Sequence, residues 1–300
     1  LALDDVAMRF WRLCQKRKWG IHIFVKDFCD FHLPFILFAD NFWLLSRYPQ
    51  VLGRMFGAWL RILRENGWTV PVEEVTWATT DPDPTPHVVL FEGKPLKRAK
   101  REEGFKALGT QVTFNNGFSA ELELRIQKAW RLFYAKKDVF MNRNIPEKKR
   151  CRVLEQLIPS SLFWCARSWN LTSAECQKLR AVQLQMYYKI VMRKQRKLES
   201  LDELMERLHR AIANVRDSIG AETWDAKYHR LVWEWGGHLA RISTYDPTRV
   251  SACVLRWKNY QWINTYAVHN SGHQGHVGRL RTWRWERPFY KLLGEQWYLG

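Results

Sequence analysis

Apolar residues in the first part of the chain alternate between helical and strand-like spacing. Residues 6–19 have apolar positions every three or four residues with arginines and lysines between them, which is typical of an amphipathic helix. Residues 21–25 and 34–45 form short apolar runs of the kind that make strands. Helical spacing resumes over residues 50–66, and Gly67 supplies a natural end. We therefore expect a helix, strands that form a hairpin, and a second helix, in this order.

Two short strands and then a succession of helices follow. Residues 88–91 and 104–114 have strand-like composition on either side of a charged stretch. Apolar stripes predict four later helices, over residues 119–137, 146–165, 172–197 and 201–217. The third of these opens with a capping box, in which Thr172 and Glu175 satisfy each other's backbone amides. From Trp224 onwards the pattern is rich in Trp, His, Gly and Arg and predicts no definite element.

These elements predict an α+β chain in three parts. Residues 1–118 would hold antiparallel hairpins with packed helices, residues 119–197 a basic helical bundle, and residues 198–300 a helical extension rich in Trp and Arg. With 46% hydrophobic and 26% charged residues, the composition is that of a globular, core-forming chain. The chain opens with Leu1 and has no basic and apolar leader, so we expect a fragment without a signal peptide.

The net charge of +18 is concentrated in the second part of the chain. Residues 1–90 carry ten basic and ten acidic side chains, whereas residues 125–197 carry 18 basic and 4 acidic ones. A field of this sign favours a polyanion, because neutralised phosphates release condensed counterions. Nucleic acid is the leading candidate for the partner. A solvated helix face or an anionic membrane surface would also account for the charge.

Two function classes are disfavoured by composition. No run approaches the ~20 apolar residues that a bilayer span requires, so we do not expect an integral membrane protein. With nucleic acid as the leading candidate, we expect no membrane partner. The six cysteines are scattered without a C-x-x-C pair, which favours a reducing, intracellular compartment over a secreted disulfide framework. Each cysteine is most simply a small buried hydrophobe.

One acidic residue, Asp40, stands at the crest of the apolar hairpin 36–45 and is followed by Asn41. A carboxylate at a hairpin tip on a basic chain is how many nucleic-acid polymerases present a metal ligand to a phosphate. The Asp-Asn pair also tolerates the positive φ that tight hairpin turns need. These ten residues alone therefore leave a metal site and a plain turn both open.

The order of several motifs resembles the palm-to-thumb passage of a reverse transcriptase, in particular that of non-LTR retrotransposons. The hairpin is similar to that family's Tyr/Phe-x-Asp-Asp hairpin, and the later motifs recur in the family's order. The matching segments are 36–45, 66–77, 105–109 with its Leu-Gly pair, 163–169 and 233–241. The resemblance implies that residues 1–118 are a partial polymerase palm, 119–197 a thumb and 198–300 a post-thumb region.

The resemblance also implies an activity, RNA-directed DNA synthesis by two-metal nucleotidyl transfer. Asp40 would bind a catalytic Mg²⁺ or Mn²⁺, and Asn41 would occupy the second catalytic position. Lys106, Leu108 and Gly109 would face the primer. Basic residues of the thumb and extension would follow the duplex of RNA template and DNA primer or target: Arg125, Lys128, Lys148, Lys149, Arg150, Arg193, Lys194, Arg281 and Arg284. The family further implies action in the nucleus.

Three departures from the family pattern bear on catalysis. Asn41 replaces the second aspartate and supplies no charge to offset a metal ion. Acidic residues at 73–74 stand where the family carries a lysine, and the strand with the other essential aspartate would precede Leu1. We therefore expect this chain to be inactive in isolation. A non-catalytic nucleic-acid-binding remnant of the same ancestry is the alternative, and an unrelated helical scaffold with a coincidental hairpin is a third hypothesis.

Two constellations near the end of the chain stay open between chemistry and structure. His269, His273 and His276 would need a fourth ligand such as Cys253 to hold zinc, and they also suit a solvated glycine-rich loop. Residues 279–287 alternate arginine with tryptophan, which suits phosphates and bases. The same alternation is typical of a half-buried element with Trp inside and Arg extending outward.

Overall fold

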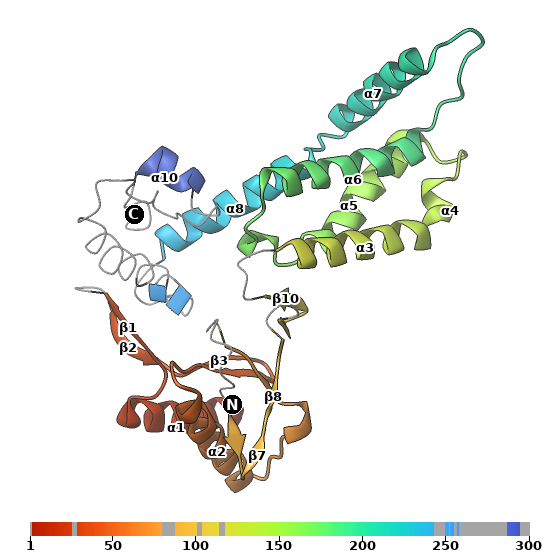
Figure 1. Ribbon diagram of the computed structural model, residues 1–300. Helices are drawn as coiled ribbons and strands as arrows, with labels where there is room; N and C mark the ends of the chain where they lie inside the picture. Colours follow the sequence, from red (N-terminus) through yellow and green to blue (C-terminus); the bar gives the residue numbers. More distant parts are fainter. Residues whose placement is uncertain are drawn as a thin grey trace. The chain divides into compact units, whose positions relative to one another are not determined.

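The computed structural model describes residues 2–25, 29–79, 88–100, 104–113, 118–242, 250–251, 253–254, 257 and 287–294. It confirms a mixed α+β chain of helices and small antiparallel hairpins (Figure 1). The chain divides into two compact units. The first takes in the described residues up to Gly109, with Thr113 and those between Arg241 and Trp257; the second takes in residues 110–112, 118–240 and 287–294.

The first unit is built on two packed helices, α1 (Ala2–Arg17) and α2 (Pro49–Glu65). Its strands are short: β1 (Ile21–Val25), β2 (Cys29–Leu33), β3 (Phe35–Phe38), β4 (Asn41–Leu44), β5 (Thr76–Trp77), β6 (Leu90–Phe91), β7 (Lys94–Pro95), β8 (Lys97–Arg98) and β9 (Phe105–Ala107). The pairs β1–β2, β3–β4 and β6–β7 are antiparallel, and β5–β8 is parallel. A 3₁₀ turn, η1 (Val72–Glu74), precedes β5.

An aromatic cluster fixes the β3–β4 hairpin to both helices. Phe42 of β4 stacks on Trp59 of α2 with ring centroids 4.0 Å apart, and Phe10 of α1 lies 5.2 Å from the same indole. Phe35 of β3 completes the cluster at 4.9 Å from Phe42. Phe10 is fully buried. Aromatic pairs prefer particular ring orientations as well as burial. This face of the hairpin therefore packs on the two helices in one defined position.

The second unit is helical after β10 (Thr110–Val112). Its helices are α3 (Ser119–Ala135), α4 (Lys137–Phe140), α5 (Glu147–Leu162), α6 (Ser173–Val191), α7 (Leu201–Ser218), α8 (Trp224–Ala240) and α10 (Arg287–Leu293), with a 3₁₀ turn, η2 (Ala166–Ser168). Helices α3, α5 and α6 pack on one another, α7 packs on α5 and α6, and α8 packs on α6 and η2 (Figure 1). The capping box of Thr172 and Glu175 at the start of α6 is confirmed.

Arg150 is buried at one end of this bundle, with 7% exposure. Its guanidinium donates to the carbonyls of Phe140, Ile145 and Ile190 at 2.8, 3.0 and 2.9 Å. Phe140 ends α4 and Ile190 lies in the last turn of α6, where helix carbonyls have no partner within the helix. Our expectation that Arg150 contacts nucleic acid was wrong, because all of these bonds hold the interior together.

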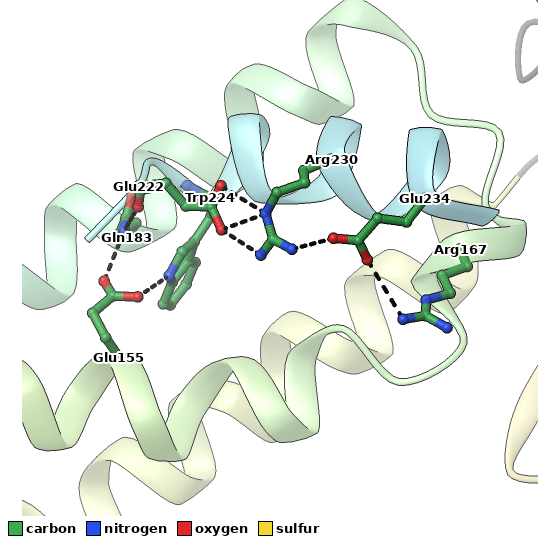
Figure 2. A network of polar contacts seen from close by, with 7 residues as sticks. All are labelled: Glu155, Arg167, Gln183, Glu222, Trp224, Arg230 and Glu234. Carbon is green, nitrogen blue, oxygen red and sulfur yellow. Dashed lines mark hydrogen bonds and ion pairs between the residues drawn. The ribbon is translucent and has the colours of Figure 1, made fainter. Parts of the chain in front are cut away.

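A polar network centred on Trp224 holds α8 to α5 and α6 (Figure 2). The buried indole donates to Glu155 at 3.0 Å, and Gln183 donates to the same carboxylate at 2.7 Å. Gln183 also accepts from the backbone N–H of Trp224 and donates to the carbonyl of Glu222, both at 3.0 Å. A buried amide with its hydrogen bonds made fixes the entry of α8, because any shift would leave polar groups unpaired.

The network continues along the exposed side of α8 through Arg230 (Figure 2). The guanidinium of Arg230 donates to both carboxylate oxygens of Glu222, with the shortest contact at 2.6 Å. It also donates to Glu234 at 2.5 Å. Glu234 also pairs with Arg167 of η2 at 3.5 Å. Exposed pairs contribute little singly, so we assign this part of the network to the direction of α8 rather than to overall stability.

Gly236 lies in the element 233–241 and has a packing role. The ring of Phe289 from α10 lies against it, and a Cβ at this position would come within 2.5 Å of the Phe289 Cε1 atom. Trp233 contacts the same ring edge-on at 4.6 Å. The glycine therefore lets α10 approach α8 closely.

The structure confirms most element positions and corrects some boundaries. Helices predicted over 119–137, 146–165 and 201–217 occur close to those limits, but the helix predicted over 172–197 ends at Val191. The expected strand 104–114 contains two short strands with a turn at Leu108-Gly109. Helices α7 and α8 share one unit with α3–α6. Among the described residues, no helix has the length and apolar character to cross a membrane.

Replacement of Arg150 tests its role in the bundle. Arg150→Ala leaves three carbonyls unsatisfied and should lower the free energy of unfolding by about 3 kcal/mol. Arg152→Ala is the matched control, since Arg152 is exposed two residues along the same helix and should change it by less than about 0.5 kcal/mol. Urea unfolding followed by circular dichroism measures both. Equal losses in the two variants would contradict the assignment.

Candidate nucleic-acid interface

The turn of the β3–β4 hairpin places Asp40 at its tip. Phe38 pairs with Asn41, so Ala39 and Asp40 form a two-residue turn and Asn41 is already in β4. The positive φ of this turn belongs to Ala39, at 51°, and not to the Asp-Asn pair as the sequence indicated. An alanine in the left-handed region is strained, and the packed hairpin keeps it there.

Asp40 is exposed and accepts a hydrogen bond from the side-chain amide of Asn41 at 3.1 Å. Mg²⁺ and Mn²⁺ prefer several oxygen ligands in near-octahedral array. Among the residues that the structure describes, no group of three His, Cys, Asp or Glu side chains could hold a metal ion. Asp40, beside an amide that donates to it, supplies one of the several oxygen ligands that a two-metal centre needs.

A second turn of the first unit contributes to the same open groove as Asp40. Leu108 and Gly109 both have positive φ, 50° and 75°, as the two central residues of a type I′ turn require. Residues 105–108 and Asp40 line one groove, together with Trp77 and Arg47. Lys106 is exposed, and no described residue forms an ion pair with it. The turn expected to bind a metal and residues 106 and 108, expected to face the primer, therefore line one groove.

Basic residues expected to contact nucleic acid divide into an exposed and a buried group. Lys128 of α3 and Lys148 and Lys149 at the start of α5 are exposed, as is Lys194 after α6. Arg193 is partly exposed and pairs with Glu147 at 2.6 Å.

Arg125 is the second correction, after Arg150. It is 5% exposed and pairs at 2.5 Å with Glu121, one turn earlier in α3. Glu121 uses its other oxygen to accept from the backbone N–H of Gln111 in β10 at 2.8 Å. The ion pair thus joins β10 to α3, and Arg125 is not available to a phosphate. Burial at this position follows from the apolar stripe, since Leu122, Ile126 and Ala129 surround it on the helix.

Several predicted residues lie outside the described part of the chain: Arg281, Arg284, His269, His273 and His276. Cys253, proposed as a fourth zinc ligand, is buried. Cys14, Cys151 and Cys176 are also buried, and burial raises the pKa of the Cys14 thiol to about 12. Cys29 is half-buried and Cys165 is exposed, so the interpretation as buried hydrophobes holds for four of the six.

The basic stretch 125–197 also contains exposed residues that the sequence did not single out as nucleic-acid contacts: Arg131, Lys136, Lys137, Arg143, Arg152, Arg196 and Lys197. None has an ion-pair partner among the described residues. Their positions between apolar-stripe residues would have identified Arg131 and Arg152 as outward-facing. The others lie where helices end, and sequence patterns place helix ends less precisely than helices.

Relief of the strain at Ala39 tests the turn geometry. Ala39→Gly should raise the free energy of unfolding by about 0.5 kcal/mol, because the ~1–2 kcal/mol of left-handed strain exceeds the ~0.5–1 kcal/mol entropy cost of glycine. Asp40→Gly is the control, since Asp40 has no positive φ, and it should destabilise by a similar amount. Thermal unfolding compares the two variants. A lower midpoint for Ala39→Gly would refute the strained turn.

Comparison with known proteins gives no relative on which to base the site. No family model matches the chain, and no curated protein or solved structure matches it either. The assignment of a function therefore rests on the residues, their exposure and their charge.

Proposed function

We propose that the chain is part of an RNA-directed DNA polymerase of the non-LTR retrotransposon type, in which it holds the duplex of RNA template and DNA primer. The observation that carries this proposal is the shared groove of Asp40 and residues 105–108. In the reverse transcriptases that the chain resembles, the turn corresponding to Asp40 belongs to the metal site and the turn corresponding to residues 105–108 contacts the primer. Mg²⁺ or Mn²⁺ as cofactor, and action in the nucleus, belong to the same proposal.

Charge supports the binding part of this function. The groove itself carries little net charge. Its described lining contains two basic residues, Arg47 and Lys106, and two acidic ones, Asp40 and Glu74. The second unit has a positive surface of its own, with exposed lysines at 128, 148 and 149 that form no ion pair with any residue the structure describes. A basic surface of this kind binds phosphates through counterion release, independently of sequence.

A second candidate is a nucleic-acid-binding protein without polymerase activity. Asn41 favours it, because its amide donates a hydrogen bond to Asp40 instead of adding a second negative charge. The absence of a three-ligand cluster among the described residues points the same way. Both candidates predict duplex binding and differ only in catalysis.

Duplex binding is tested by fluorescence anisotropy with a labelled RNA–DNA hybrid over a range of salt concentrations. The double variant Lys148→Ala/Lys149→Ala should bind more weakly and reduce the slope of log K against log salt by about 2, because each lysine neutralises about one phosphate. Lys178→Ala is the control, since this exposed lysine already pairs with Glu123. Unchanged affinity and slope in the double variant would remove α5 from the interface.

Because the chain alone is expected to be inactive, primer extension on the same hybrid is measured with the full-length protein of which the chain is proposed to be part, and it separates the two candidates. A polymerase predicts extension by the wild type with Mg²⁺ or Mn²⁺ and a loss of roughly a hundredfold or more in Asp40→Ala, because a metal ligand supplies several kcal/mol of transition-state stabilisation. Duplex binding without extension by the wild type would assign the chain to the second candidate. Equal extension by Asp40→Ala would show that Asp40 is not a ligand.

A further inference from the structure

The loop between α6 and α7, residues 192–200, combines positive charge with an exposed apolar tip. It contains Arg193, Lys194, Arg196 and Lys197 in five consecutive positions, followed by Leu198. The leucine is 98% exposed, and the flanking Met192 and Leu201 are 61% and 68% exposed. A leucine left so far out of the protein gains nothing from folding, so its apolar surface is available to a partner.

A bidentate ion pair closes this loop onto α7. Arg207 donates to the two oxygens of Glu199 at 2.7 and 2.8 Å, and to the carbonyl of Lys194 at 3.0 Å. Glu199 also accepts from the backbone N–H of Arg196 at 2.8 Å, and its own carbonyl accepts from Gln195 at 2.7 Å. The hydrogen bonds from Arg207 and from the Arg196 amide lower the pKa of Glu199 to about 2, so the closing carboxylate is charged at neutral pH.

The hydrogen bonds of Arg207 and Glu199 fix the backbone of the loop but do not involve the charged ends of its other basic side chains. Lys194, Arg196 and Lys197 are exposed, and their side chains pair with no described residue. Leu198 has a φ of 69°, a left-handed conformation that is strained for leucine and is held between Lys197 and the Glu199 ion pair. The loop is thus ordered around one protruding leucine instead of collapsing over it.

Further positive charge lies beside the loop. Arg193 pairs with Glu147, the first residue of α5, and the next two residues of that helix are the exposed Lys148 and Lys149. Of the nearby acids, Glu147 and Glu199 are paired with arginines, whereas Asp202 and Glu203 are exposed in the first turn of α7. The start of α5 therefore adds positive charge beside Arg193, at the beginning of the loop.

We propose that the 192–200 loop is a wedge for a nucleic-acid duplex: Lys194, Arg196 and Lys197 contact the phosphates and Leu198 packs into the groove against the base stack. This inference rests on the proposed function, to which it adds a specific contact. Proteins that distort duplexes combine basic residues with an apolar side chain that partly unstacks a base step. An anionic membrane fits less well, because amphipathic membrane binding needs a continuous apolar face rather than a single fully exposed leucine.

The test uses an RNA–DNA hybrid with 2-aminopurine in the DNA strand, whose fluorescence rises when the base unstacks. The wild-type chain should bind and raise the fluorescence. Leu198→Ala should abolish the rise and weaken binding by about tenfold, the loss expected for one buried leucine side chain. The triple variant Lys194→Ala/Arg196→Ala/Lys197→Ala should reduce the salt slope by about 3. Folding should be preserved in each, because the altered side chains are exposed and none forms a hydrogen bond or ion pair with a described residue.

A second exposed leucine and a lipid vesicle serve as controls. Leu292→Ala removes a leucine that is 72% exposed on α10 and should leave both affinity and fluorescence at the wild-type level. Wild-type binding with no fluorescence change, or Leu198→Ala equal to wild type, would overturn the wedge and leave the proposed function standing. No wild-type binding to the hybrid would overturn both. If Leu198→Ala instead loses co-sedimentation with equimolar phosphatidylcholine and phosphatidylserine vesicles while duplex binding is unchanged, the loop is a membrane contact.

Discussion

The arrangement of the helical unit depends on the hydrogen bonds of one buried charge, that of Arg150. A guanidinium removed from water is tolerated only when its donors are used, and here they reach carbonyls from α4, from the turn before α5 and from the end of α6. These three segments must then meet at one place. The start of α5 and the 192–200 loop consequently share one end of the bundle, which is where the exposed lysines and arginines gather.

Each unit fixes its exposed features by a different interaction. In the first, the stacked rings of Phe42 and Trp59 seat the hairpin that carries Asp40. In the second, polar bonds at Arg150 and Trp224 position the ends of helices. Aromatic stacking tolerates small shifts, whereas a buried hydrogen bond is lost within a few tenths of an ångström. A surface that has to present several charges in register therefore benefits from polar anchors beneath it.

Periodicity was sufficient to predict most helices, and the capping box at Thr172 set the start of α6. It did not distinguish Arg150 from Arg152, because burial of the former depends on carbonyls 10 and 40 residues away in sequence. The charge pattern predicts a helix end over 193–197, but this run forms a loop after α6 ends at Val191. Ser200 caps α7 through Glu203, and Arg207 binds Glu199, so two interactions further along the chain compete with continuation of α6. The turn at Asp40 was located correctly to within one residue, but its strain falls on Ala39, since the strand register decides which residue bends.

Binding and catalysis make unequal demands on these residues. Binding a duplex requires a field that acts over roughly 8–10 Å, and scattered exposed lysines supply it even when single positions vary. Metal catalysis requires several oxygen ligands at fixed distances of about 2 Å, and loss of one charge cannot be compensated from afar. At the hairpin, Asn41 satisfies Asp40 with a hydrogen bond, which stabilises the isolated carboxylate and reduces its pull on a cation. In the proposed function, the exposed lysines would supply the field that duplex binding needs, whereas the hairpin would supply one of the several ligands that metal catalysis needs, so loss of Asp40 and loss of a lysine should have very different effects.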